Sequence, residues 1–276
     1  MRIHDLAVVA GLMCGACAGP SMNEQRRPVQ SIAELADAAK THLAAKRIYF
    51  GHQSVGTNIM DGVADLVRVT PGLRLNVLAI DGALPGSGGF FAHGAIGKNT
   101  EPESKTDDFA HRIEGGFGAA LDIALHKYCY VDITASTDIE AVFRHYRDTM
   151  ARLRDEYPKV VFVHVTVPVT QIRSGLRADM KKLFGKAPDG YGDDFRRAQF
   201  NERLRREYAG SEPVFDLATI ESTDPQGRTQ TINLKGVTGQ ALFVPYTTDG
   251  GHLNEVGRRR VAEELLVMLA SLSSPK

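Results

Sequence analysis

The chain has no tryptophan, little cysteine and no excess of charge of either sign. Its 276 residues include no Trp and three Cys, and 33 Lys and Arg residues balance 33 Asp and Glu residues. Without tryptophan there is no indole surface on which a sugar ring can stack, although tyrosine can take that role. The formal net charge of zero argues against a protein that binds nucleic acid through a general basic surface, so no nucleic-acid partner is expected.

The sequence also lacks an apolar run long enough to cross a membrane. The apolar stretch near the N-terminus covers residues 6–13, far fewer than the ~20 residues that a spanning helix needs. One arginine precedes this stretch and small residues follow it, which is typical of a short secretory signal, although Asp5 is unusual in one. We therefore expect a signal peptide over residues 1–18, a polar tether over residues 19–30 and one folded domain over residues 31–276.

Two interpretations of the end of this signal stay open. Ala16-Cys17-Ala18 fits a cleavage site of the A-x-A type. Alternatively, Cys17 is the lipid-modified cysteine of a bacterial lipoprotein, although Cys14 stands where leucine is usual. Both interpretations predict export: to the periplasm, to a membrane through a lipid anchor at Cys17, or into the medium. The sequence leaves the oligomeric state open.

Cysteine is scarce in the expected mature domain, where Cys129 is the only one. A single cysteine cannot form an internal disulfide. Cys129 lies in an apolar run, and neither a helix start nor a pattern of cations around it indicates a reactive thiolate. We therefore expect a buried side chain that packs as a small apolar group.

Patterns that would indicate a metal or a nucleotide are also missing. The nine histidines are scattered, without an H-x-x-x-H pair on one helix face and without cysteine partners, so no metal site is expected. The glycines of the stretch DGALPGSGG match neither G-x-G-x-x-G nor a phosphate-binding loop with its lysine. We therefore expect a protein that works without a cofactor.

Segments of strand and helix character alternate about five times along the chain. Apolar residues recur at helical spacing in several segments, and short runs of β-branched and aromatic residues separate them. The expected helices cover residues 31–46, 58–69, 109–122, 138–158, 195–209 and 255–272. The expected strands cover residues 47–51, 73–80, 123–133, 159–170 and 213–220, with a small hairpin within residues 228–251. This alternation predicts parallel strands joined by helical crossovers in a single α/β sandwich.

In such sheets, ligands bind beyond the carboxyl ends of the strands. The segments expected there are GHQSVGTN after the first strand, a long loop over residues 81–106 after the second, TASTD after the third, and TDGGHLN before the last helix. Three of these four segments are rich in glycine and in polar side chains. They are therefore the places to look for chemistry.

Ser54 lies between the first strand and the helix that follows it. At a helix N-terminus the backbone N–H groups point outward and the helix dipole favours negative charge. These conditions suit a nucleophile whose attack creates an oxyanion. The alternative is that Ser54 is a structural N-cap, since serine is favoured at that position.

Near the other end of the chain, Asp249 precedes His252 by three residues in a glycine-rich loop. A histidine there can act as a general base, and the carboxylate can orient its imidazole and stabilise the imidazolium that forms. The alternative is a loop histidine beside a capping aspartate. The combination of a serine after the first strand and an Asp-x-x-His before the last helix favours the catalytic interpretation.

This combination resembles the SGNH hydrolases, also called the GDSL-like esterase superfamily. The block DGGHLNEVGRRRVAEELL is similar to the family's final motif, and the resemblance in order and topology covers roughly residues 46 to 270. It implies a three-layer α/β/α sandwich with a parallel, flavodoxin-like sheet. It also implies that Ser54 is the nucleophile, His252 the base and Asp249 the partner of that base.

The first block of the sequence departs from the family's pattern. The family's Gly-Asp-Ser stands here as His52-Gln53-Ser54. The resemblance places His52 and Gln53 beside the nucleophile, where His52 either lines the site or packs under the loop.

The family's oxyanion hole uses the serine N–H, a glycine after the second strand and an asparagine after the third. The third-strand pattern puts Cys129 on a glycine and Val131 on that asparagine, and a valine side chain cannot donate a hydrogen bond. Gly97 is the candidate for the glycine, and Asn99 is a candidate replacement donor. The alternative is an ordinary turn, in which Gly and Asn are common.

The resemblance implies hydrolysis of an acyl ester of a small molecule or a carbohydrate. The leading hypothesis is an exported serine esterase that deacetylates carbohydrate, the carbohydrate being inferred from exported members of the superfamily. The same triad can instead transfer an acyl group to a sugar hydroxyl, which would make the protein an O-acyltransferase on exported polysaccharide. A third hypothesis is a catalytically inactive domain that binds glycans.

Overall fold

The computed structural model of the protein describes residues 31–172, 190–234 and 237–272. The expected signal peptide, the tether and Cys17 lie outside these ranges. Within them, no helix is both long enough and apolar enough to span a bilayer.

A six-stranded sheet forms the middle layer, and every neighbouring pair of strands is parallel. The strands lie in the order β2-β3-β1-β4-β5-β6. Their bounds are Arg47–His52 for β1, Val77–Ala79 for β2, Phe90–Ala95 for β3, Ile123–His126 for β4, Val161–Val165 for β5 and Val214–Phe215 for β6. The sheet places β1 at its centre, between β3 and β4, so the residues that follow β1 emerge in the middle of the carboxyl edge.

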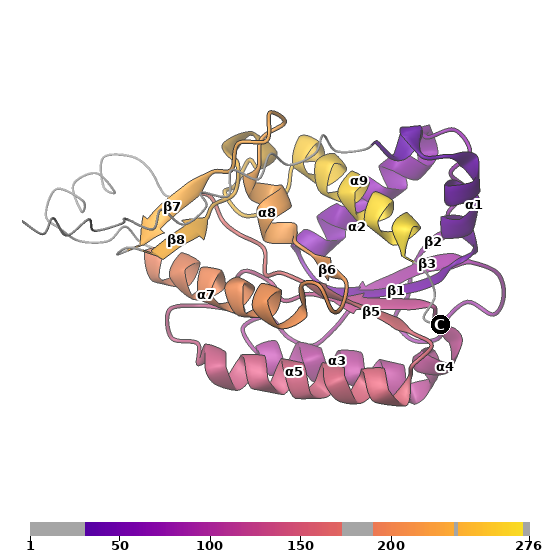
Figure 1. The fold of residues 1–276 in the computed structure, drawn as a ribbon, viewed down its shortest axis with the longest axis horizontal. Helices are drawn as coiled ribbons and strands as arrows, with labels where there is room; N and C mark the ends of the chain where they lie inside the picture. The colour runs from indigo at the N-terminus through magenta and orange to yellow at the C-terminus, as the bar shows by residue number, and fades with distance from the viewer. Residues whose placement is uncertain (1–30, 173–189, 235–236, 273–276) are drawn as a thin grey trace, which may run out of the picture.

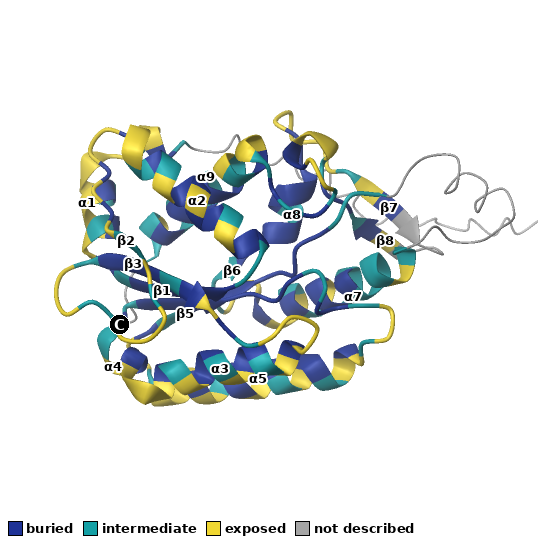
Figure 2. Ribbon diagram, turned by 180° about the vertical axis from the view of Figure 1, so that it is seen from behind, coloured by how far each residue is buried: buried dark blue, intermediate teal, exposed yellow. Residues whose placement is uncertain are grey.

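Helices cover both faces of the sheet, which makes the three-layer α/β/α sandwich that the sequence predicts (Figure 1). One layer contains α1 (Asp37–Ala45), α2 (Val55–Val69), α8 (Leu217–Ser222) and α9 (Glu255–Ser271). The other contains α3 (Pro102–Arg112), α4 (Gly118–Ala120), α5 (Ile139–Glu156) and α7 (Tyr191–Tyr208). Two separate apolar cores result, one on each face of the sheet. The buried colour follows the inward faces of the helices in Figure 2.

The packing of α2 against α9 positions the site. The apolar side chains of Ile59, Val63 and Leu66 recur at helical spacing on α2 and are buried. Burying each such side chain stabilises the fold by about 1.5–3 kcal/mol. Gly62 lets the two helices approach closely, because a Cβ atom there would lie 2.5 Å from the Arg258 carbonyl oxygen. The start of α2 is thereby held beside the loop that leads into α9.

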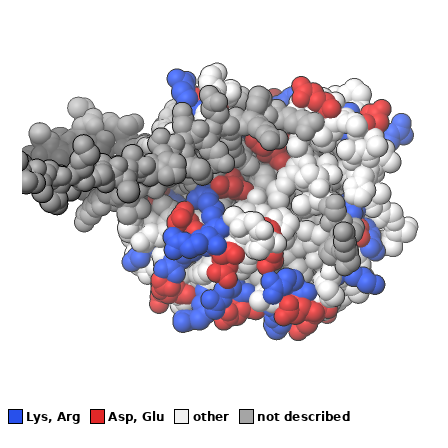
Figure 3. All heavy atoms as spheres, in the orientation of Figure 1, with Lys and Arg blue, Asp and Glu red and all other residues white. Residues whose placement is uncertain are grey.

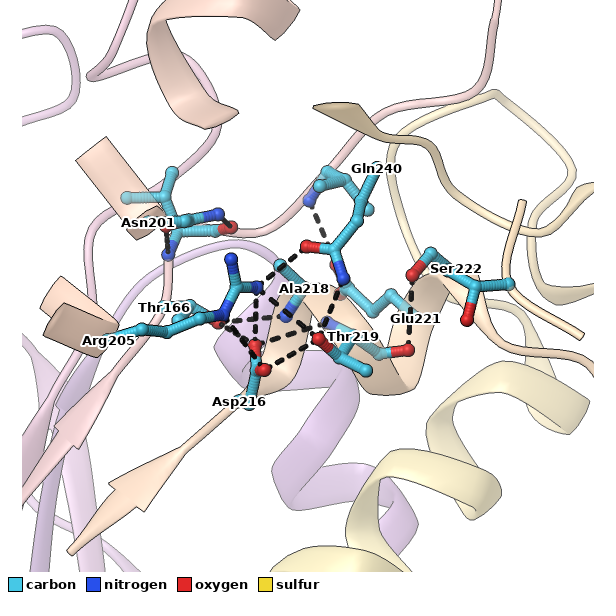
Figure 4. A network of polar contacts seen from close by, with 12 residues as sticks. Thr166, Asn201, Arg205, Asp216, Ala218, Thr219, Glu221, Ser222 and Gln240 are labelled. Atoms are coloured by element: carbon cyan, nitrogen blue, oxygen red, sulfur yellow. Dashed lines mark hydrogen bonds and ion pairs between the residues drawn. The ribbon is translucent and has the colours of Figure 1, made fainter. Parts of the chain in front are cut away.

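A two-stranded antiparallel hairpin lies beside α7 and α8. It consists of β7 (Thr231–Leu234) and β8 (Val237–Gln240), within the segment where the sequence predicts a hairpin. The Gln240 side chain accepts a hydrogen bond from Arg205 of α7 and donates one to Thr219 of α8, each at 2.7 Å (Figure 4). The Arg205 guanidinium also pairs with Asp216, the N-cap of α8, at 2.7 Å. This network joins the hairpin to both helices.

Basic and acidic side chains alternate on the face shown in Figure 3 rather than forming a patch of one sign. Among the ion pairs of α5 and α7 are Arg203 with Glu140, and Arg154 with Glu212. This pairing agrees with the balanced charge of the sequence.

The main error of the sequence prediction concerns the second strand and the loop after it. Residues 81–106, expected to be one long loop, contain the whole of β3 and the start of α3. The expected strand over residues 73–80 is only the short edge strand Val77–Ala79. The apolar run at Phe90 is flanked by glycines, which hid the strand. Gly94 is needed inside it, because a Cβ atom there would lie 2.3 Å from the Ile80 carbonyl oxygen.

Three other expected strands end earlier than predicted, and one of them is β5, which ends at Val165 rather than at residue 170. β4 ends at His126, and the residues from Lys127 to Ile133 form a turn rather than a longer strand. β6 contains only Val214 and Phe215, because Asp216 caps α8 with its side chain and ends the strand. Each of these errors extends a strand into the residues at the carboxyl edge of the sheet.

Candidate active site

Ser54 follows β1 directly and occupies the N-cap position of α2 with a strained backbone. Its φ of 55° and ψ of −114° lie in a region that residues other than glycine rarely adopt. Its side chain makes no capping hydrogen bond, so the serine does not serve as an N-cap of the usual kind. Its backbone N–H has no acceptor among the described residues. The residue therefore presents, at the carboxyl edge of the sheet, a hydroxyl that its own helix does not use and an N–H that is free of acceptors among the described residues.

The hydroxyl of Ser54 lies against His252, and His252 lies against Asp249. The Ser54 Oγ is 2.7 Å from the His252 Nε2, and the His252 Nδ1 is 2.6 Å from the Asp249 Oδ2. The hydroxyl, the imidazole and the carboxylate therefore form one continuous line of hydrogen bonds. The histidine and aspartate side chains are about half exposed, so a substrate can reach the line from solvent.

Asp249 is held in its charged form by the loop around it. Its Oδ1 accepts the backbone N–H groups of Gly251 and His252, at 2.9 and 2.8 Å. Partial desolvation raises the pKa of Asp249, but these N–H groups and the imidazole lower it more, so the pKa falls below its ordinary value. The ionised carboxylate fixes a proton on the His252 Nδ1 and leaves the Nε2 free to accept one from Ser54.

The loop that contains the histidine is tied to α2. The backbone N–H of Leu253 donates to the side-chain oxygen of Asn58 at 3.2 Å. Thr247 and Leu253 pair as an isolated antiparallel bridge, which closes the loop at its base. These bonds hold the imidazole at a fixed position beside the first turn of α2.

His52 packs under the nucleophile loop rather than lining the site. Only 4% of it is exposed, and its Nε2 lies 3.0 Å from the His93 Nδ1. Its ring fills the space beneath the first turn of α2, because a Cβ atom at Gly56 would lie 2.4 Å from it. Burial, helped by the nearby Lys127 and His93, lowers the pKa of His52 well below its ordinary value, so the ring is neutral.

Gln53 connects the nucleophile loop to the segment after β3. Its amide nitrogen donates to the carbonyl oxygens of Ile96 and Gly97, both at 2.7 Å. The side chain is thus occupied by contacts within the protein. These contacts fix the distance between the loop after β1 and the loop after β3 at the carboxyl edge of the sheet.

The structure does not leave Gly97 free to serve as an oxyanion donor. Its N–H donates to the Asp108 carboxylate at 2.9 Å. Gly97 instead allows a tight turn, since its φ is 51° and a Cβ atom there would lie 2.5 Å from the Lys105 nitrogen. An oxyanion would have to compete with the Asp108 carboxylate for this N–H, so the expected role of Gly97 as a donor stays a prediction.

Asn99 is exposed, and the oxygen of its side-chain amide is hydrogen-bonded. Its side-chain oxygen accepts a hydrogen bond from the Lys105 Nζ at 2.8 Å. Its NH₂ group has no acceptor among the described residues, which leaves two N–H donors free.

The turn after β4 contains residues that sequence reasoning missed. Cys129 is fully buried with a free thiol, as predicted, and its Sγ lies 3.5 Å from the Gln53 carbonyl oxygen. Asp132 and Lys105 form an ion pair with no exposed surface, at 2.6 Å. The position of Asp132, directly after the valine that replaces an asparagine, is the one signal that could have indicated it.

A polar cavity of about 760 Å³ opens beside the triad. The Tyr130 ring forms part of its wall and meets the His252 ring edge-on, with 5.8 Å between the ring centroids. Arg197, which is paired with Asp194, donates to the Tyr130 carbonyl oxygen at 2.8 Å and holds that wall in place. The described residues that line the cavity are mostly polar or small: Thr100, Tyr130, Val131, Thr134, Thr170, Gln171, Ile172, Gly190, Asp193, Asp194, Arg197, Asp249, Gly250 and Gly251.

Within the described ranges, no group of His, Cys, Asp and Glu residues could hold a metal ion.

Comparison with known proteins finds solved structures that share the fold of this chain. No protein-family model and no curated protein sequence matches the chain. Among solved structures, a peptidoglycan O-acetylesterase aligns over 87% of this chain and 96% of its own, with a TM-score of 0.50 and 12% identity. The lipase/acylhydrolase from Enterococcus faecalis aligns over 84% and 98% of the two chains, with a TM-score of 0.41 and 13% identity. A family 3 carbohydrate esterase from Talaromyces cellulolyticus aligns over 82% and 98%, with a TM-score of 0.43 and 11% identity. The likeness to the peptidoglycan O-acetylesterase, at a TM-score of 0.50, shows that the chain shares the fold of that structure in a divergent form.

Proposed function

We propose that the protein is a serine esterase that hydrolyses acyl esters. The single observation that carries the proposal is the line from the Ser54 Oγ through His252 to Asp249, with contacts of 2.7 and 2.6 Å. A hydroxyl on an imidazole nitrogen whose other nitrogen is held by a carboxylate is the arrangement that activates serine for acyl transfer.

The reaction proceeds in two halves. The His252 Nε2 takes the proton of the Ser54 hydroxyl while the Oγ attacks the ester carbonyl carbon. The bond to the alcohol oxygen then breaks, the imidazolium returns its proton to the leaving alcohol, and the acyl group stays on Ser54. Water attacks this acyl-enzyme, His252 takes the water proton and returns it to the Ser54 oxygen, and the acid leaves. Asp249 stabilises the imidazolium in both halves.

Two groups are proposed to stabilise the oxyanion that each attack creates. The free N–H of Ser54 is the first, since it belongs to the same residue as the attacking oxygen. The free NH₂ of Asn99 is the second, in place of the asparagine that the sequence replaces with Val131. Loss of one such donor typically costs about 10²- to 10³-fold in kcat.

The substrate proposed is an acylated carbohydrate, most simply an acetylated one. The cavity beside the triad supports this, because its hydroxyl, amide and charged side chains suit an alcohol with many hydroxyl groups. With water as acceptor the enzyme is a deacetylase. With a sugar hydroxyl as acceptor the same acyl-enzyme would make it an O-acyltransferase, and measuring acetate release against acetyl transfer to an oligosaccharide distinguishes the two.

Export is proposed from residues 1–18 alone. The N-terminal residue of the mature protein, determined by mass spectrometry, tests it. A lipidated Cys17 or a new N-terminus near residue 19 would support export, and an intact Met1 in the purified cellular protein would contradict it.

The esterase proposal is tested with p-nitrophenyl acetate and a fluorophosphonate probe. The wild-type protein should release p-nitrophenol and carry the probe, and Ser54→Ala should do neither. Ser271→Ala is the matched control, because Ser271 lies at the end of α9, where its hydroxyl bonds only the Met268 carbonyl oxygen among the described residues. Equal turnover by the wild type and Ser54→Ala would refute the proposal, and a folded wild type that takes no probe would leave only a binding domain.

A further inference from the structure

We infer that the buried ion pair between Lys105 and Asp132 positions Asn99 for catalysis, and that Lys105 is a positioning residue of this esterase. The inference rests on the proposed function, since it concerns how the oxyanion donors of that site are held. Neither side chain has exposed surface, so neither can touch a substrate directly.

The pair joins the first turn of α3 to the turn after β4, at the carboxyl edge of the sheet. The Asp132 Oδ2 accepts hydrogen bonds from the Lys105 Nζ and the Cys129 N–H, both at 2.6 Å. Its Oδ1 accepts the N–H of Thr100 at 2.8 Å. The carboxylate belongs to the turn after β4, and both of its oxygens bond the segment after β3, through Lys105 and Thr100, so it fastens the two segments together.

Gln53 completes a ring of contacts around the nucleophile. Its amide bonds the segment after β3 through the carbonyl oxygens of Ile96 and Gly97. Its own carbonyl oxygen meets the Cys129 thiol of the turn after β4. The three segments that follow β1, β3 and β4 are thus bonded to one another, and Ser54 follows directly on one of them.

Lys105 also selects the orientation of the Asn99 amide. An ammonium group has donors only, so it can bind the amide oxygen but not the NH₂ group. The contact of 2.8 Å between the Lys105 Nζ and the Asn99 Oδ1 therefore directs the NH₂ away from the buried pair. Without Lys105 the exposed amide could rotate by half a turn, and an oxygen would replace the two donors.

Stability alone explains this pair poorly. Desolvation of two charges costs several kcal/mol, and apolar side chains of similar volume often stabilise a core as well or better. What apolar side chains cannot supply is a carboxylate that accepts two backbone N–H groups and an ammonium that orients an amide. Thr100 adds to this interpretation, because its φ of 70° is held by its N–H bond to Asp132.

The test is a double-mutant cycle between Lys105→Met and Asn99→Ala, measured as kcat and KM for p-nitrophenyl acetate. If Lys105 acts through Asn99, each single variant should lose about 10²-fold in kcat with little change in KM, and the double variant should be no slower than either. A folded Lys105→Met protein with wild-type kcat would overturn the inference. Losses that multiply in the double variant would overturn it too.

Removing Lys105 leaves a buried carboxylate unpaired, so that variant can fail to fold. Asn99→Asp covers this case, because residue 99 is exposed and the new carboxylate can still pair with Lys105 while it offers no donor. The Asn99→Asp protein should fold normally and lose about as much kcat as Asn99→Ala. A wild-type kcat for Asn99→Asp would also reject the inference.

Asp122→Asn is the matched control, since Asp122 pairs with Arg47 at the start of β1, at the opposite edge of the sheet. It should lower the melting temperature and leave kcat unchanged. Because Ser54→Ala tests the esterase independently, an active enzyme with insensitive Lys105 and Asn99 variants would reject this inference and the role of Asn99 as an oxyanion donor, but not the esterase itself.

Discussion

Ser54 and His252 are 198 residues apart in the sequence, yet the Ser54 Oγ lies 2.7 Å from the His252 Nε2. The distance depends on the packing of α2, which Ser54 precedes, against α9, which follows His252. A change that separates these two helices should therefore affect the reactive atoms even if it lies far from them.

Gly62→Ala should test this dependence. The added Cβ atom would lie 2.5 Å from the Arg258 carbonyl oxygen, and overpacking of this kind typically costs 1–3 kcal/mol, so we expect a loss of stability of about that size. We also expect slower labelling of Ser54 by the fluorophosphonate probe at a temperature where the protein stays folded. Gly115→Ala is the control, because a Cβ atom there meets no atom within 4 Å. Unchanged labelling of a folded but destabilised Gly62→Ala protein would show that the site tolerates helix separation.

Asp249→Asn should lower kcat by about 10⁴-fold, because the amide would favour the wrong tautomer of His252. The pKa of Asp249 lies below its ordinary value, so the carboxylate stays charged throughout the range in which the enzyme is assayed. Protonation of Asp249 should therefore not limit activity above about pH 4. Its contribution to stability is present above the ordinary carboxyl pKa and is lost as the pH falls through the lower folded value. A pH–rate profile together with acid unfolding curves of the wild type and Asp249→Asn would check both statements.

Glu221 should make the fold less stable as the pH rises. It is fully buried, and burial raises its pKa to about 8, against the opposing effects of the Val169 N–H and the nearby Lys127. Between the unfolded carboxyl pKa of about 4.3 and this value, the native state holds a proton that the unfolded chain has released. Stability from this group is therefore complete below about pH 4 and falls by at most about 1.4 kcal/mol per pH unit until pH 8.

Glu221→Gln isolates that dependence, since the glutamine oxygen can still accept the Val169 N–H. Urea unfolding from pH 5 to pH 8 should show a shallower decline for this variant than for the wild type. Parallel curves for the two proteins would mean that Glu221 is already ionised in the native state.

The sequence predicts the longer helices and the loops that contain the proposed triad, because these depend on local patterns, but it assigns most of α8 to a strand and the start of α3 to a loop. Helical spacing identifies α2, α5 and α9, and a serine after β1 with Asp249 and His252 before α9 indicates the three groups of the proposed triad. Their spacing in the chain does not determine distances, which come from helix packing. The order of strands and helices, together with the family resemblance, was enough to place these three side chains at the carboxyl edge of the sheet.

The residues that support the triad were not predictable in the same way. Lys105 and Asp132 look like ordinary surface charges in the sequence, and only the packing of α3 against the turn after β4 buries them. Gly97 looks like a backbone donor, but Asp108, eleven residues later, takes its N–H. In each case the partner lies on another element, and neither periodicity nor composition carries that information.

The backbone conformation at Ser54 reverses the usual order in which alanine stabilises a fold more than glycine does. In most positions alanine is more favourable than glycine, because glycine is the more flexible residue in the unfolded chain. At a φ of 55° and a ψ of −114° alanine keeps the steric conflict while glycine relieves it, a difference on the order of 1–3 kcal/mol. Ser54→Gly and Ser54→Ala should both be inactive, since both lack the hydroxyl. Ser54→Gly should nevertheless melt at a higher temperature than Ser54→Ala. Selection for heat resistance alone would favour the loss of a side chain here, so a serine at this position implies that something other than durability maintains it.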